Sequence, residues 1–370
     1  MGNLTGIICF SELCEKAMSL SRDDTSSSRD KFKGLINRAY TQEIQRKEDW
    51  SFLKASSSIA CTAKYDTGTL SATAGSASIT GSGTTWVTGM TGRKIKITGN
   101  ENIYTFTYAS ATTGTISPVF SGADDASGAG YVIYDDDYAL ASDFDRFLQN
   151  GSLFKYRSGK PYSLDDYTSN DRLWRDEFTY SPSDETRRFR VMGFDSSMYR
   201  VAQVNPPPNT AIALQYDYIK ALLPMTEYRT GTITTLTNGL KAVTGSSDTD
   251  FDGYATSGYT YYFRIDRDGV GDSSMWYKIT SFDSDTGITL ASAYQGVAIS
   301  SGIEEYTISM IPLMPYAFHD WLLYLACIHA AVDQNDPILQ GWIAEARLIE
   351  NECKKLYKNR NPNTDLDVEC

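Results

Sequence analysis

The sequence predicts an α+β protein: a helical core from both ends of the chain, a β region, and two similar, small all-β modules inserted between them. Three observations support this fold class. Apolar residues recur at helical spacing near both ends, the stretches between are rich in threonine, serine, glycine and β-branched residues, and one β stretch recurs. We expect five parts: N-terminal helices (1–57), a first β module (58–137), a core β region with a long loop (138–230), a second β module (231–311), and a C-terminal helical hairpin with a tail (312–370).

Helices are predicted near the N-terminus because apolar side chains repeat at the i, i+3, i+4, i+7 spacing that places them on one helix face. This face consists of Phe32, Leu35, Ile36, Ala39, Tyr40 and Ile44. Trp50, Phe52 and Leu53 follow it and are expected to close the helical part against an apolar surface.

The C-terminal part is predicted to be an αα-hairpin, because two apolar faces follow one another with a break between them. The first face contains Trp321, Leu322, Leu325 and Ile328, and the second contains Ile338, Trp342, Ile343, Ala346, Ile349 and Leu356. The break falls at "QNDP" (334–337), where the proline cannot continue a preceding helix.

Two β stretches share one pattern of strands and turns. The first contains the strand candidates "WVTGM", "RKIKITG", "NIYTFTY" and "GYVIY". Tyr104 and Tyr277 lie 173 residues apart, as do Gly114 and Gly287, while "SITGSGTTWV" matches "AVTGSSDTDF" and "YVIY" matches "YTIS". We interpret this as one unit used twice. The alternative is that strands rich in threonine and glycine resemble each other through composition alone.

The region between the modules combines strands with a long irregular segment. "RRFRVMGFD", "YRVAQVN" and "AIALQYDYI" are predicted strands, and the three prolines of "NPPPN" (205–209) require a turn. Residues 156–178 contain Tyr162, Trp174 and Phe178, and a connection of this length is typical of binding loops. These aromatic side chains either dock against another chain or pack on their own sheet.

Reactive chemistry is poorly represented, so we expect no enzyme and no cofactor. The two histidines, His319 and His329, lie in one apolar helical run, and no phosphate-binding, dinucleotide-binding or nucleophile motif occurs. The turn "DTDFDG" resembles the first half of a calcium loop, which makes Asp248, Asp250 and Asp252 weak candidate metal ligands. The last ligand position holds tyrosine instead of glutamate, and a hairpin turn rich in Asp and Gly explains the segment better.

Charge and cysteine content exclude further classes. The net charge of −12, from 46 acidic and 34 basic residues, argues against a protein that binds nucleic acid by neutralising phosphates. The six cysteines form no C-x-x-C pair and indicate reduced thiols of a protein made in a cytoplasm. No stretch approaches the roughly 20 apolar residues of a membrane helix, and the N-terminus lacks a basic segment, so we expect neither membrane contact nor a signal peptide.

The order of the parts resembles the head-to-tail adaptors, also called connector or tail-tubular proteins, of tailed bacteriophages, especially short-tailed ones. The resemblance rests on a helix ending in "INRAYTQEIQRKEDWSFL", the strand pair "RVAQVNPPPNTAIALQYDYI" and the final helix "QGWIAEARLIENECKKLYK". It covers about 1–57, 138–230 and 312–360. The two β modules depart from smaller adaptors and resemble the immunoglobulin-like or other small β insertions of phage structural proteins.

The resemblance implies a homo-oligomeric ring, typically a dodecamer, which lies in the virion neck beneath the portal and is assembled in the cytoplasm of the host bacterium. Such a ring prolongs the DNA channel and receives the tail nozzle or tail tube, and its helical parts pack side by side between copies. We expect an acidic channel lining that repels phosphate, so that DNA passes without sequence-specific binding.

The resemblance also implies contact residues. The C-terminal stretch is the candidate for portal contact, with Leu356, Tyr357, Lys358, Arg360 and Asp365. The loop aromatics Tyr162, Trp174 and Phe178 are candidates for contact with a tail component.

Two alternatives stay open. Another ring component of the phage neck or tail, such as a nozzle, stopper or tail-completion protein, has the same mixture of parts. A glycan-binding protein that grips sugars with its β modules needs exposed aromatic side chains in one concave patch, and Trp86 and Trp276 are the residues to examine.

Overall fold

The protein is described here from a computed structural model. It describes residues 9–22, 26–122, 126–148, 152–168, 181–183, 185–256, 258–266, 275–300, 304–334 and 337–357.

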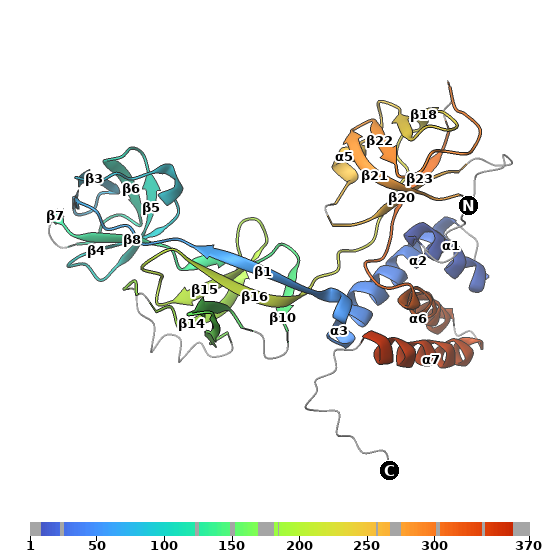
Figure 1. Cartoon of the computed structure of the whole chain (residues 1–370), viewed down its shortest axis with the longest axis horizontal. Coiled ribbons are helices and arrows are strands. Elements are labelled where there is room, and N and C mark those ends of the chain that lie inside the picture. Colours follow the sequence, from blue (N-terminus) through green and yellow to red (C-terminus); the bar gives the residue numbers. More distant parts are fainter. Residues whose placement is uncertain are drawn as a thin grey trace, which may run out of the picture. The chain divides into compact units, whose positions relative to one another are not determined.

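The chain divides into two compact units. The first is formed by Met1–Leu53 and Ala221–Cys370, and the second by Lys54–Lys220 (Figure 1). Helices and largely antiparallel sheets occur together, so the α+β class predicted from the sequence is confirmed. The five-part division is finer than this split and stays a prediction.

Helices from both ends of the chain pack together in the first unit. Their bounds are α1 Phe10–Leu20, α2 Ser26–Arg38, the π-helix η1 Ala39–Ile44, α3 Gln45–Lys47, the 3₁₀-helix η2 Ser51–Leu53, α6 Ala317–Gln334 and α7 Leu339–Tyr357. α6 contacts α1, α2, η1 and α7 and is buried around most of its circumference, whereas α7 buries one stripe formed by Trp342, Ala346 and Cys353. None of the described helices is both long and apolar enough to cross a membrane.

Most residues of the apolar faces predicted from the sequence are buried or half-buried inside a single chain, but Ile338 and Leu356 of the second C-terminal face are 47% and 68% exposed. Phe32, Ile36 and Tyr40 from the N-terminal face and Trp321 and Leu322 from the C-terminal face are each at most 1% exposed. Burying one large apolar side chain contributes about 2 kcal/mol, so these faces hold the unit together. This corrects the expectation that these apolar faces join the helical parts of neighbouring copies. Any packing of helices between copies has to use other, exposed side chains.

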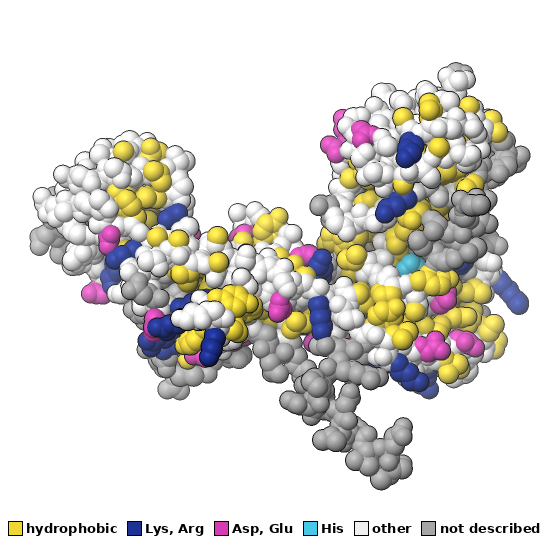
Figure 2. All heavy atoms as spheres, in the orientation of Figure 1, with side chains coloured by type: hydrophobic (Ala, Val, Ile, Leu, Met, Phe, Trp, Pro, Cys, Tyr) yellow, Lys and Arg dark blue, Asp and Glu magenta, His cyan; other side chains and the backbone are white. Residues whose placement is uncertain are grey.

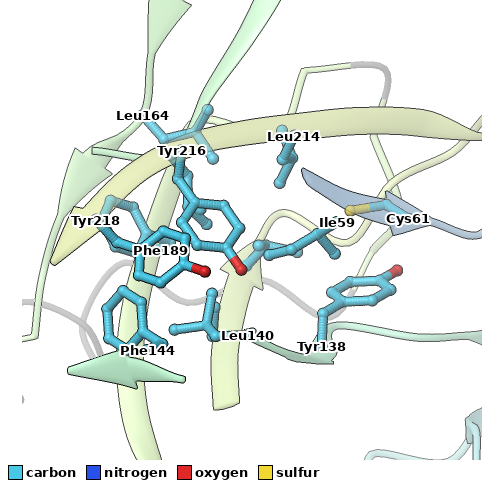
Figure 3. Packing of buried hydrophobic residues seen from close by; sticks show 13 residues of the cluster. Ile59, Cys61, Tyr138, Leu140, Phe144, Leu164, Phe189, Leu214, Tyr216 and Tyr218 are labelled. Carbon is cyan, nitrogen blue, oxygen red and sulfur yellow. The ribbon is translucent and has the colours of Figure 1, made fainter. Parts of the chain in front are cut away.

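The middle of the second unit consists of two sheets around one core. Their strands are β1 Lys54–Cys61, β9 Asp137–Ala139, β10 Phe144–Phe147, β11 Phe154–Arg157, β12 Lys160–Ser163, β13 Asp165–Asp166, β14 Arg188–Phe194, β15 Arg200–Asn205 and β16 Ile212–Lys220. One sheet has the order β1-β16-β11-β12 with β10 also on β16, and the other has the order β13-β14-β15-β9. Both face the same apolar cluster, in which Tyr216 lies among Ile59, Leu214, Phe189 and Tyr138 (Figure 3).

The first β module is one antiparallel sheet that closes on itself. Its elements are β2 Thr69–Ala72, β3 Ser78–Ser82, η3 Thr88–Met90, β4 Lys94–Ile97, β5 Ile103–Tyr108, β6 Thr113–Ser117, β7 Ala126–Ala129 and β8 Tyr131–Tyr134, with the strand order β7-β2-β3-β6-β5-β4-β8. The end strands β7 and β8 are separated in sequence by Gly130 alone. Because one continuous segment pairs with both ends of the sheet, the module is a small closed barrel.

The second β module repeats this topology. Its elements are β17 Glu227–Tyr228, β18 Ile233–Leu236, β19 Ala242–Gly245, α5 Phe251–Tyr254, β20 Tyr261–Ile265, β21 Tyr277–Ser284, β22 Gly287–Leu290 and β23 Tyr306–Met310. Read from β18, the order β18-β19-β22-β21-β20-β23 corresponds strand for strand to β2-β3-β6-β5-β4-β8. Isolated bridges from Ile233 to Glu304 and from Leu236 to Ile299 take the place of the pairing between β2 and β7.

The register of the strands repeats as well. Ile95 pairs with Tyr104 in the first module, and Phe263 pairs with Tyr277 in the second. The apparent equivalence of Gly114 and Gly287 is wrong by one residue. Gly114 pairs with Ile79, but the corresponding Val243 pairs with Ile288, because β21 carries register shifts that lengthen the hairpin.

The closed sheet differs from the immunoglobulin-like expectation. An immunoglobulin-like domain is a sandwich of two separate sheets. In each module the described strands instead form one connected seven-stranded sheet. The shared strand order supports a duplicated module, and the closure favours a barrel over a sandwich.

Candidate partner-binding surfaces

The described cysteines and His319 are buried, whereas the partly exposed His329 Nε2 lies 2.5 Å from the Glu43 Oε1. No group of three or more His, Cys, Asp and Glu side chains there is placed to hold a metal ion. Burial raises the pKa of the Cys9, Cys14 and Cys61 thiols to about 12, which keeps them protonated and unreactive near neutral pH. His319 is buried in α6, and burial lowers its pKa to about 4, so it is a neutral core residue.

The acidic turn proposed as a weak calcium site has a structural explanation. Asp250 precedes α5, and its Oδ1 accepts a hydrogen bond from the Gly253 N–H at 3.0 Å, which caps the short helix. Asp248 and Asp252 are exposed. Tyr259, at the position of the final calcium ligand, accepts a hydrogen bond from the Leu223 N–H at 2.9 Å. The segment is therefore the capped turn of the alternative interpretation.

Two of the candidates for portal contact, Leu356 and Tyr357, lie at the end of α7 and differ in their surroundings. The Tyr357 ring packs on Phe318 and Phe52 of its own chain, with ring centroids 5.4 and 6.4 Å apart. Leu356 is 68% exposed and can meet a partner. Lys358, Arg360 and Asp365 lie outside the described residues.

The hairpin of β11 and β12 presents one of the candidates for tail contact. Tyr162 is 44% exposed, and its hairpin neighbour Tyr156 is 59% exposed. The Lys155 Nζ lies 5.9 Å from the centroid of the Tyr162 ring, which places a cation beside the aromatic surface. The candidates Trp174 and Phe178 fall outside the described residues.

The hairpin of β14 and β15 is a further exposed surface that the sequence analysis did not single out. Phe194, Met198 and Tyr199 at its end are 55%, 72% and 40% exposed. The guanidinium carbon of Arg200 lies 4.5 Å from the centroid of the Phe194 ring. Figure 2 shows hydrophobic and basic side chains together in the region of these strands. The signal in the sequence is "FDSSMY", an Asp-Ser-Ser turn flanked by apolar residues on both sides.

A buried cluster of charges fixes the second module to the helices of the first unit. The Glu227 carboxylate, 4% exposed, lies 2.7 Å from the Arg29 Nη2, 3.0 Å from the Lys33 Nζ and 3.4 Å from the Arg229 Nε. Burial alone would raise the pKa of Glu227, but the hydrogen bond and charge of Arg29, supported by Arg229 and Lys33, outweigh it and hold this pKa at about 2. The carboxylate is therefore ionised at any physiological pH.

A second ion pair joins the same elements. The Arg264 Nη2 on β20 lies 2.9 Å from the Glu15 Oε1 on α1, and its Nε lies 2.9 Å from Asp266. The Ser11 N–H donates to the Ser309 Oγ at 2.8 Å. Paired charges and satisfied hydrogen bonds make this contact specific as well as stable.

The first module is tied to the neighbouring sheet by a different carboxylate. Asp136, fully buried between β8 and β9, lies 2.5 Å from the Lys94 Nζ, which also lies 2.9 Å from Asp137. Burial and the nearby Asp137 raise the pKa of Asp136, Lys94 opposes the rise, and the resulting pKa is about 6. This carboxylate, unlike Glu227, titrates just below neutral pH.

Comparisons with known proteins identify no family. No family model matches the chain, and no curated protein matches it. Among solved structures it is similar to translation elongation factor SelB from Methanococcus maripaludis, in the apo form (TM-score 0.14, 9% identity, 70% of this chain and 64% of that chain) and in complex with the GTP analogue GPPNHP (TM-score 0.15, 9% identity, 70% and 62%). Less than two thirds of either SelB chain is covered, and at these TM-scores the likeness carries no argument.

Proposed function

We propose that this chain is a virion structural protein of a tailed bacteriophage: a head-to-tail adaptor that forms a ring between portal and tail and extends the DNA channel. The observation that carries the proposal is the plan of the chain. Helices from both ends pack in one unit with one of two duplicated β modules, and two hairpins of the other unit expose aromatic side chains. This plan supplies contact area instead of chemistry.

In this proposal the terminal helices form the helical core of the ring subunit, and the two β modules are small all-β insertions, closed as barrels instead of immunoglobulin-like sandwiches. The strand order shared by the modules supports a duplicated insertion. A closed barrel serves the same purpose as a sandwich, because either one adds a compact surface to a ring.

The partners follow from the exposed candidates. Leu356 at the end of α7, together with Lys358, Arg360 and Asp365, contacts the portal in this proposal, and Tyr162 on the β11–β12 hairpin contacts the nozzle or tail tube. The exposed fractions of Leu356 and Tyr162 support these roles. The ring is homo-oligomeric, typically with twelve copies, and the chain's net charge of −12 suits a channel that repels DNA phosphates and lets the duplex slide.

The structure weakens one of the two alternative functions and leaves the other open. A glycan-binding role that relies on Trp86 and Trp276 loses support, because Trp86 is 2% exposed and Trp276 lies beneath the Arg264 guanidinium at 4.5 Å. Another ring component of the phage neck or tail, such as a nozzle, stopper or tail-completion protein, needs the same kinds of surface and differs in its partners.

The test of the function is assembly. The purified chain is examined by mass photometry over a range of concentrations and by negative-stain microscopy, alone and with phage portal rings. We expect closed rings that add one layer to the portal ring. A chain that stays monomeric and ignores portal rings overturns the proposal, and rings that bind a nozzle but never a portal favour the alternative.

A further inference from the structure

The end of the β14–β15 hairpin is a built, rigid projection. The Asp195 Oδ1 accepts hydrogen bonds from the N–H groups of Ser197 and Tyr199 at 2.9 and 2.8 Å. Met198 has a φ of +62°, a left-handed conformation that costs a residue with a side chain about 1 kcal/mol. We call Phe194, Met198, Tyr199 and Arg200 the hairpin tip. A fixed, strained turn that holds apolar side chains in solvent is typical of a contact site.

The second β module carries four carboxylates at one pole. Asp248, Asp250, Asp252 and Asp285 are all exposed, and we call them the acidic pole. Figure 2 shows acidic side chains at this end of the module, near α5.

Aromatic surface adjoins these carboxylates. The Asp250 N–H donates to the Tyr228 hydroxyl at 2.6 Å, and the rings of Tyr228 and Tyr254 are 4.9 Å apart. The Tyr254 hydroxyl contacts Thr226 at 2.9 Å, and Leu223, earlier in the same segment, is 46% exposed.

The first module contains the same pole without the charges, as three recurring hydrogen bonds show. The Gly81 N–H donates to the Thr112 carbonyl oxygen, and the Gly245 N–H donates to that of Thr286. The Thr84 hydroxyl donates to the Ala111 carbonyl oxygen, and the Thr249 hydroxyl donates to that of Asp285. The same two carbonyl oxygens accept from the Trp86 N–H and the Phe251 N–H, and all six distances are 2.8 to 3.1 Å. These bonds place Thr85, Val87 and Ala111 at the positions of Asp250, Asp252 and Asp285. The turn that contains Asp248 is one residue longer than the corresponding turn of the first module, in which Gly83 has a φ of +68°.

Comparison of the two modules shows which residues of the acidic pole the barrel fold requires and which it does not. The same hydrogen bonds form in the first module with Val87 and Ala111 in place of Asp252 and Asp285, so they do not depend on these two carboxylates. Asp250 has a structural role as well, because it caps α5. Exposed carboxylates gathered on one surface create a negative potential that attracts cations. The acidic pole therefore suits an external partner that is cationic, and its aromatic neighbours suit a partner that is also apolar.

We propose that the hairpin tip of one copy of this chain docks on the acidic pole of the next copy. This inference rests on the proposed ring. Arg200 meets the carboxylates, while Phe194 and Met198 pack on the Tyr228 and Tyr254 side. Arginine, aromatic residues and methionine are the side chains enriched at interface cores. Two different surfaces of one chain form a heterologous contact, which closes into a ring by rotation.

The proposal also resolves a difficulty in the fold. The helix faces of Phe32 and Trp321 are buried within their own chain and cannot join copies. The hairpin tip and the acidic pole lie in different units of the chain and are both exposed. They supply the two unlike faces that a ring subunit requires.

The test uses two full-length variants that each remove one surface. The tip variant carries Phe194→Ser and Met198→Gly, and glycine suits the left-handed turn. The pole variant carries Asp248→Asn, Asp252→Val and Asp285→Ala, of which the last two introduce the residues of the first module at these positions. The matched control carries Glu101→Gln and Val119→Ser, which change an acid and an apolar side chain exposed elsewhere in the first module.

Self-association is measured by sedimentation velocity and mass photometry, and folding by circular dichroism. We expect both variants to fold and to self-associate about 30-fold or more weakly than the wild type, as for hot-spot truncations, while the control assembles normally. Mixed together, the tip variant and the pole variant each keep one working surface, so the mixture forms dimers and nothing larger.

The outcomes separate the two proposals. If the wild type forms rings and either variant assembles as well as it does, the docking proposal is wrong and the ring proposal stands. If the variants are monomeric and their mixture forms no dimers, the pairing of tip with pole is also wrong. A wild type that never assembles, alone or with portal rings, overturns the proposed function and the docking contact together.

Discussion

Glu227 and Asp136 are both buried carboxylates, but their surroundings shift their pKa values in opposite directions. Glu227 has three cations within 3.4 Å, and their charge outweighs the effect of burial. Asp136 has one lysine and a neighbouring aspartate, so burial dominates. The two carboxylates therefore give the first and second units different responses to acid.

Replacement of Glu227 by glutamine is expected to destabilise the first unit. The folded pKa, about 2 against an ordinary 4.5, means that the ionised carboxylate stabilises the fold above pH 4.5 and that this contribution is lost as the pH falls toward 2. We expect Glu227→Gln to lower the free energy of unfolding by about 3 kcal/mol at pH 7, with little difference from the wild type near pH 2. Urea denaturation followed by tryptophan fluorescence at several pH values measures this, and an equal loss at both pH values contradicts it.

Replacement of Asp136 by asparagine is expected to remove a pH dependence of the second unit. Because the folded pKa is raised to about 6 from 3.8, the folded state holds the proton more tightly than the unfolded state, and stability decreases as the pH rises from about 4 through 6. We expect Asp136→Asn to flatten the urea midpoint over this range. Asp66→Asn, at an exposed ion pair, serves as the control and should leave the slope unchanged.

Among the secondary-structure elements, the duplicated modules show which turn residues the barrel requires. Both modules begin with the pattern Y-x-T-G-T, at residues 65–69 and 228–232. Gly68 and Gly231 in these segments have φ values of +81° and +78°. A side chain there is strained by the backbone and also meets neighbouring atoms.

Gly231→Ala is expected to destabilise the second module more than Gly239→Ala does. Both glycines have positive φ, but a Cβ at Gly231 meets the Thr249 Cγ2 at 2.7 Å and the Ser246 Oγ at 2.9 Å, whereas a Cβ at Gly239 meets nothing within 4 Å. We expect losses of about 2 kcal/mol or more for the first and about 1 kcal/mol for the second. Thermal melts of the two variants decide the order, and equal losses are the contradicting result.

The sequence predicted helices and strands correctly where apolar side chains recur at a regular spacing over several turns or residues. The stripe containing Phe32 and Ile36 predicted a helix, and Tyr104 with Tyr277 located the duplicated hairpins. The shift of one residue after Tyr277 was not predicted, because a bulge leaves no signal in a list of apolar positions. The Y-x-T-G-T pattern is also present in the sequence, but it lies in the turns that precede the strands and carries no strand periodicity.

At the scale of the whole molecule, the regular spacing of apolar residues predicts that a helix face is buried. It does not predict whether the same chain or a neighbouring copy covers that face. The resemblance to phage adaptors implied that the helical parts pack between copies, but the structure buries Trp321 and Phe32 in their own chain. The tip of the β14–β15 hairpin was missed for the opposite reason. Phe194 and Met198 flank a polar turn, and nothing in the sequence distinguishes an apolar residue exposed at a turn from one that folds back.

If arginine and carboxylate side chains join the copies, assembly depends on salt. Raising sodium chloride from about 50 mM to 500 mM shortens the Debye length from about 14 Å to about 4 Å and weakens exposed charge pairs. We expect the wild type to self-associate several-fold more weakly at the higher salt concentration, by sedimentation velocity. The control variant should show the same slope and the pole variant almost none. Salt-independent assembly of the wild type contradicts an electrostatic contact.

The pairing of β1 with β16 has a consequence for the architecture of the gene product. Lys54 and Ile219 are cross-strand partners, so the entry and exit of the 54–220 segment are neighbours in space. A segment whose ends meet can be excised like a cassette, with a short glycine-rich link joining Leu53 to Ala221. The shortened chain should still melt cooperatively, and foreign domains with adjacent termini should be tolerated at the same place.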